Sequence, residues 1–274
     1  MKIGLVPMSA KPYHAGHHML VELAAIAEIT DEVRSLELPV NDEVVVFVSF
    51  SSRGVKKIKD PTDSRTLKQG ARKIEVPKAG ETPVFGTDMQ HIWNNLLKPN
   101  LNLPSKVKII SPDDGASPAP VRSIHEVCGA LKDAYDAGEE TFQVPYTNIV
   151  ATVSETTINI YSDDEDIVKN YSKALMTQQY GELWNNSASP KITGVGVPRT
   201  ATVEISGTKM RGYLCNGDIE SFSSLLPPLP NDIKAEIATI LADSASCGIP
   251  LKKRSADIKN EAVLRNYIQN ILSA

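Results

Sequence analysis

The sequence lacks the features of a membrane-spanning, secreted or metal-binding chain. No apolar run approaches the ~20 residues needed to cross a bilayer, and the run at residues 44–48 has the length of a strand. The apolar residues 3–6 are too few for the core of a signal peptide, and Pro7 follows them. The three cysteines, Cys128, Cys215 and Cys247, are scattered without metal-ligand spacing. We therefore expect a reduced, cytoplasmic protein with no membrane partner and no metal site of its own.

A large excess of charge of either sign is also missing. The formal net charge is −4, with 23% charged and 41% hydrophobic residues, which is typical of a globular protein. Because the chain as a whole is not basic, we expect no nucleic-acid partner. The P-loop pattern Gly-x-x-x-x-Gly-Lys-Ser/Thr is absent as well, so a nucleotide would need another kind of site. The length of 274 residues allows one large domain, or one domain with extensions.

The most informative stretch lies at the start of the chain. Residues 3–6 predict a short strand, Pro7 begins a loop, and a helix is expected from His17 because apolar residues recur on one face at Leu20, Leu23, Ala24 and Ala27. A helix N-terminus after a strand and a tight loop can bind an anion through its free N–H groups. Gly16 lets a phosphate approach the main chain, and His14 and His17 can direct ring N–H groups at the same oxygens.

A second stretch of this kind lies at Ile205-Ser-Gly-Thr-Lys-Met-Arg211. Residues 202–205 predict a strand that leads into a helix over residues 207–214. Met210 and Leu214 lie four apart and should face the core, which turns Arg211 by about 100° from Met210, towards the start of the helix. Taken singly, Ser206 could simply cap this helix and Arg211 could pair with an acid.

Two motifs, His14-x-Gly-His17 and Ile205-Ser-x-Thr-x-x-Arg211, together resemble the two signatures of the cytidylyltransferase-like nucleotidyltransferases, with Ser206 lying 192 positions after His14. This superfamily is related to the class I aminoacyl-tRNA synthetases, and the form seen here is similar to that of the nicotinamide mononucleotide adenylyltransferases. The resemblance implies a Rossmann-like fold and transfer of AMP from ATP, with Mg²⁺, to a small, phosphorylated acceptor, with release of pyrophosphate.

The resemblance also implies roles for individual residues. His14, His17 and Arg211 would stabilise the phosphates during catalysis, and Lys11 would follow the departing pyrophosphate. The remaining nucleotide-binding residues would be Pro7, Met8, Ser9, Gly16, Ser206, Gly207 and Thr208.

Some residues depart from the usual patterns. The loop reads Met8-Ser-Ala-Lys-Pro-Tyr13 instead of Phe-x-Pro, and Gly207 stands in place of a second serine, as in some sulfate adenylyltransferases. The Lys-Met-Ser-Lys-Ser sequence of the synthetases is missing, so we do not expect a tRNA ligase. Two alternatives stay open, a cytidylyltransferase that uses CTP and a nucleotide-binding sensor without turnover.

Strands and helices alternate along the first ~220 residues, which predicts an α/β fold: a Rossmann-like, doubly wound, mostly parallel sheet with helices on both faces. We expect strands at residues 44–48, 107–110, 148–153, 157–161 and 191–197. Residues 1–225 would form the nucleotidyltransferase domain, with residues 55–105 as an insertion or lid. Residues 226–274 would form a C-terminal helical extension.

The acceptor site is less well marked. The basic segment 55–87 is expected to be a solvated loop rather than a substrate-contacting lid. Asp163 and Asp164 follow a predicted strand and could cap the next helix, line the ligand site, or do both. With Arg53 and Trp93 they are our candidates for acceptor binding. A homo-oligomer is compatible with the sequence.

Overall fold

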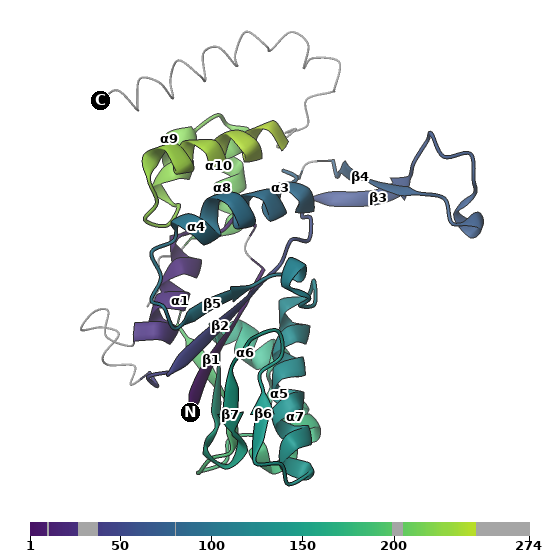
Figure 1. Cartoon of the computed structure of the whole chain (residues 1–274). Coiled ribbons are helices and arrows are strands. Elements are labelled where there is room, and N and C mark those ends of the chain that lie inside the picture. Colours follow the sequence, from purple (N-terminus) through teal and green to yellow (C-terminus); the bar gives the residue numbers. More distant parts are fainter. Residues whose placement is uncertain (10, 27–37, 80, 199–204, 245–274) are drawn as a thin grey trace. The chain divides into compact units, whose positions relative to one another are not determined.

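The computed structural model describes residues 1–9, 11–26, 38–79, 81–198 and 205–244 (Figure 1). The chain divides into two compact units. The first unit comprises Met1–Phe50 and Asn102–Ile205, and the second comprises Ser51–Leu101 and Ser206–Ala274. The second unit therefore joins the middle of the chain to its C-terminal part, whereas the sequence suggested a division at residue 225.

A five-stranded, all-parallel sheet forms the centre of the first unit, which confirms the predicted α/β fold. Its strands are β1 (Lys2–Met8), β2 (Glu43–Val48), β5 (Val107–Ile110), β8 (Thr157–Asp163) and β9 (Lys191–Val197). The spatial order is β5-β2-β1-β8-β9, so the chain moves outwards from β1 to one edge and then returns to build the other. The side chains of the central strands are almost fully buried, as is typical of parallel sheets covered on both sides.

Helices flank this sheet (Figure 1). They are α1 (Ala15–Ile26), α5 (Pro120–Asp136), α6 (Asp164–Asn170) and α7 (Lys173–Tyr180). Leu5 and Val45 belong to the same buried cluster as Ile124 and Val127 of α5. Helix α1 is tied to the loop before β2, because the carbonyl of Ala24 accepts a hydrogen bond from the side-chain amide of Asn41.

One prediction for the first unit needs correction. The strand expected at residues 148–153 is shorter, β7 (Val150–Thr152), and pairs antiparallel with β6 (Thr141–Gln143) outside the main sheet. His125 of α5 is half-buried and bonds to the hydroxyl of Tyr180 through Nδ1 at 2.7 Å. Cys128 is a fully buried free thiol in the core.

The second unit is mainly helical. It contains α3 (Gly86–His91), which continues into a π-helical segment (Ile92–Leu97) and then α4 (Lys98–Asn100). Helices α8 (Gly207–Cys215), α9 (Ile219–Ser224) and α10 (Asn231–Ser244) complete the described part.

The basic segment 55–87 is not a simple loop. Strands β3 (Val55–Lys59) and β4 (Lys73–Pro77) form an antiparallel hairpin within it. The predicted strand at residues 202–205 lies, apart from Ile205, outside the described residues. None of the described helices has the length and apolarity to cross a membrane.

Candidate functional site

The sheet opens at one place, between its central strand β1 and its neighbour β8. Pairing of β1 with β2 continues to Met8 and Val48, and pairing of β8 with β9 continues to the last residue of β8. Pairing of β1 with β8, however, ends at Leu5 and Ile160, although each strand continues for three more residues. This is the point at which the strand order reverses, and ligands of open α/β sheets bind at the carboxyl ends of strands at such a point.

Helix α1 begins immediately beyond the carboxyl end of β1. His14 precedes the helix, and its carbonyl accepts a hydrogen bond from the amide of His18 at 3.1 Å. The amide N–H groups of the first turn, which includes Gly16 and His17, have no partner inside the helix. The predicted strand, loop and helix N-terminus are therefore present, and the helix starts two residues earlier than expected, at Ala15.

The rings of His14 and His17 stack on each other, with centroids 3.7 Å apart and planes inclined by 30°. His14 is buried, and the Nδ1 atoms of both rings are inaccessible and make no hydrogen bond within the described part of the protein. A buried polar atom left unpaired costs about 1–3 kcal/mol. Such an arrangement is unusual unless another group, such as a ligand, supplies the missing bond.

Burial also fixes the charge of this histidine pair. It lowers the pKa of His14 from its ordinary value of 6.5 to about 4. The pKa of His17 is lowered well below 6.5, first by burial and then by the neighbouring His14. Both rings are therefore neutral at pH 7 in the protein by itself, and each then carries one N–H donor.

Neighbouring side chains hold the pair in place, and sequence reasoning missed them. The hydroxyl of Tyr13 lies 3.2 Å from Nδ1 of His18, and Nε2 of His18 lies 3.4 Å from Glu22. The Tyr13 ring stacks against His17 at 5.9 Å, with the planes 11° apart. The i,i+4 spacing of His18 and Glu22 was the signal available in the sequence. Because both ring nitrogens of His18 have partners, its role is to support the site.

The other residues expected around this loop lie close along the chain. Pro7 and Met8 are the last residues of β1, Ser9 follows as an exposed residue, and Gly16 is buried in the first turn of α1. Lys11 is half-buried in the turn before the helix. The first unit therefore gathers one set of predicted nucleotide-binding residues at the end of β1.

The acidic turn after β8 has a structural role. Asp163 caps α6 by accepting a hydrogen bond from the amide of Asp166 at 2.9 Å. The carboxylate of Asp164 lies close to Gly196 of β9. A Cβ added to this glycine would be only 2.2 Å from an oxygen of Asp164. The cap accounts for Asp163, while Asp164 is exposed next to the carboxyl ends of β8 and β9.

The second predicted motif lies in the second unit, at the N-terminus of α8. Ser206 caps this helix by accepting from the amide of Lys209 at 3.1 Å, and Gly207 and Thr208 form its first turn. Nη2 of Arg211 donates to the hydroxyl of Thr208 at 3.1 Å. Met210 is fully buried, as the helical pattern predicted.

Arg211 also shares its surroundings with other charged groups. Burial, and then the nearby guanidinium of Arg53, lower the pKa of Arg211, while Glu81 acts in the opposite direction. Two arginines, a helix N-terminus and two hydroxyl groups thus belong to this part of the second unit. Trp93, our other candidate from this unit, lies in its core with 2% of its surface exposed.

Among the residues that the structure describes, no three His, Cys, Asp or Glu side chains come together as a possible metal-binding group. Comparison with known proteins returned no matching family model, no matching curated protein and no matching solved structure.

Proposed function

We propose that this protein is a nucleotidyltransferase that transfers AMP from ATP to a small, phosphorylated acceptor and releases pyrophosphate. The observation that carries the proposal is the stacked pair of His14 and His17 at the start of α1, with both Nδ1 atoms buried and unpaired. The pair follows the central strand at the point where the sheet order reverses. A phosphate group at this position would supply hydrogen-bond partners to the histidines and to the helix N-terminus.

In the proposed reaction an oxygen of the acceptor attacks the α-phosphorus, and the bond from the α-phosphorus to the bridging oxygen breaks as pyrophosphate leaves. The enzyme has little covalent work to do, because rate enhancement in phosphoryl chemistry comes mainly from positioning and from stabilising charge. Neutral His14 and His17 each offer one N–H to the phosphate oxygens. The negative charge of the nucleotide would favour protonation of the pair, which would add a second donor to a ring.

The N-terminus of α8 also carries groups of the kind that bind phosphates. Arg211 can bind two oxygens with its planar fork, and Ser206 and Thr208 provide hydroxyl groups at the start of α8. Arg53 would add a second guanidinium to this set, since its charge already acts on Arg211. The Mg²⁺ that accompanies a triphosphate would be held mainly by the phosphates themselves.

The test is pyrophosphate release with each of the four ribonucleoside triphosphates, against acceptors of the enzymes that the motifs resemble. We expect release with ATP and at least one phosphorylated acceptor, and its loss in the variant His14→Gln/His17→Gln. The control His91→Gln, which changes an exposed histidine of α3, should keep wild-type activity. Faster release with CTP would favour a cytidylyltransferase. Calorimetric binding of a nucleotide without release under any combination would make the protein a sensor.

A further inference from the structure

The hairpin of the second unit has a charge opposite to that of the whole chain. Residues 55–77, which we call the basic ribbon, contain seven Lys and Arg against three Asp and Glu, a net charge of +4 in a chain of −4. The rest of the sequence therefore carries −8. The expectation of no nucleic-acid partner used the average charge of the chain, and this average conceals the ribbon.

The acidic side chains of the ribbon are already engaged in building it. Asp60 accepts from the amide and hydroxyl of Thr62, at 2.9 and 2.6 Å. Asp63 accepts from the backbone and the guanidinium of Arg65 and from the amide of Arg72, at 2.7–3.0 Å. Glu75 pairs with Lys57 at 3.6 Å. No acidic partner is present within the described ranges for the four remaining lysines, Lys56, Lys59, Lys68 and Lys73.

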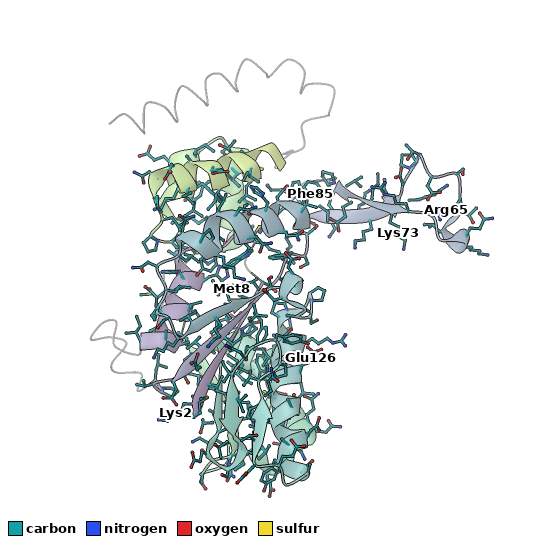
Figure 2. All side chains as sticks on the ribbon, viewed as in Figure 1. Lys2, Met8, Arg65, Lys73, Phe85 and Glu126 are labelled. Atoms are coloured by element: carbon teal, nitrogen blue, oxygen red, sulfur yellow. The ribbon has the colours of Figure 1, made fainter. Side chains whose placement is uncertain are left out.

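The strand register places like charges directly across from each other. Lys59 pairs with Lys73, an arrangement that destabilises an antiparallel pair unless an anion lies nearby. Because side chains alternate along a strand, Lys59 and Lys73 share one face with Lys57, while Lys56 lies on the opposite face. Lys68 is exposed in the turn that joins the strands, and Figure 2 shows Arg65 and Lys73 on this ribbon. Cations therefore line both faces and the tip.

We propose that the basic ribbon binds double-stranded nucleic acid by entering the major groove. The two strands of a ribbon lie about 4.8 Å apart, and the major groove, about 12 Å wide, accepts a two-stranded β-ribbon. Phosphates border the groove on both sides, which matches cations on both faces of the ribbon. Contacts of this kind are made to the backbone, so binding should be largely independent of sequence.

Other partners fit the ribbon less well. A bilayer or an acidic protein surface would face one side of the ribbon and leave the cations of the other side unused. Apolar exposure is also modest on the strands, where Ile58 is 37% exposed and Ile74 and Val76 are half-buried. The proposal is independent of nucleotidyl transfer, since it uses none of the residues assigned to that reaction.

The test is binding of a fluorescein-labelled, mixed-sequence 20-base-pair DNA duplex by the full chain, followed by anisotropy between 50 and 300 mM salt. Four phosphate contacts should give a slope of log K against log salt of about −3.6. The variant Lys59→Gln/Lys73→Gln should reduce this slope in magnitude by about 1.8 and weaken binding about tenfold or more at 0.1 M salt. The matched control, Lys169→Gln/Lys173→Gln, removes two exposed lysines from α6 and α7 and should bind as the wild type does.

The variant Lys59→Arg/Lys73→Arg should keep the wild-type slope, because it keeps the charge. If circular dichroism shows that the glutamine variant is misfolded, Lys56→Gln/Lys68→Gln tests the same contacts and should lose a similar part of the slope. The proposal is overturned if the wild type does not bind the duplex at 50 mM salt, or if the ribbon and control variants lose affinity equally. Tighter binding to polyglutamate, to vesicles containing phosphatidylserine or to a second copy of the chain would also overturn it.

Discussion

Acid should destabilise the first unit because His14 is buried without a charge partner. The pKa of His14 is about 4 in the folded protein, against an ordinary value of 6.5. Between these values the unfolded chain binds a proton that the folded state does not bind, so stability falls as the pH falls. From pH 7 to pH 5 this histidine alone should lower the free energy of unfolding by about 2 kcal/mol, and by about 3 kcal/mol once the pH is below 4. His17 acts in the same direction.

The assay is urea unfolding at pH 7, 6 and 5, followed by tryptophan fluorescence. The chain has two tryptophans, Trp93 in the second unit and Trp184 in the first. In a Trp93→Phe background the signal comes from Trp184, which is buried beside β9. The variant His14→Gln cannot take up this proton, so it should lose about 2 kcal/mol less than its parent between pH 7 and pH 5.

Two controls make this result decisive. His91→Gln replaces an exposed histidine and should show the same loss on acidification as the parent. Saturating triphosphate should reduce the loss, because an anion beside the imidazoles favours their protonated form. An equal loss in the parent and in His14→Gln would refute the reasoning, since it would mean that His14 is not buried and neutral in the folded protein.

Four further predictions concern the two motifs, the acidic turn and the need for Mg²⁺. His17→Ala should lower kcat for pyrophosphate release by about 10²-fold or more with little effect on folding, because the lost N–H acts on charge that develops during reaction. Arg211→Lys should lower kcat/KM for the triphosphate by about tenfold or more and leave the melting temperature nearly unchanged, because lysine keeps the charge but not the bidentate fork. Asp163→Ala should cost about 1 kcal/mol of stability through loss of the α6 cap. Pyrophosphate release should need added Mg²⁺, with no stoichiometric zinc in the purified protein.

Each of these predictions has its own contrary outcome. Near wild-type turnover in folded His17→Ala would remove that residue from the reaction. The control for Arg211→Lys is Arg122→Lys, which changes an arginine paired with Glu126 on α5. A large fall in the melting temperature of Arg211→Lys would show that Arg211 stabilises the fold instead of binding the triphosphate. Asp163→Asn keeps a capping oxygen and should restore stability, so a raised KM for the acceptor in that variant would show that the carboxylate contacts substrate. Activity that survives EDTA would contradict the role of Mg²⁺.

The sequence alone determined the elements of the sheet and the start of the site. A strand that is apolar on both faces, such as residues 44–48, must have both faces buried. Such runs therefore predicted the strands of a parallel sheet. Pro7, Gly16 and the helical stripe that follows fixed the strand, loop and helix of the first motif, because each depends on neighbours along the chain. The helix of the second motif, with Met210 inward and Ser206 as its cap, was readable for the same reason.

Tertiary structure decided what depends on groups distant in sequence. The depressed pKa of His14 and its stacking on His17 result from burial, which no local pattern reports. The capping role of Asp163 needed the hydrogen bond to be seen, because the same residues suit a cap or a ligand site. The pairing of Lys59 with Lys73 is set by strand register, and a shift of one residue would move each side chain to the other face. Local interactions thus specified the elements, while packing and register set their charges and surroundings.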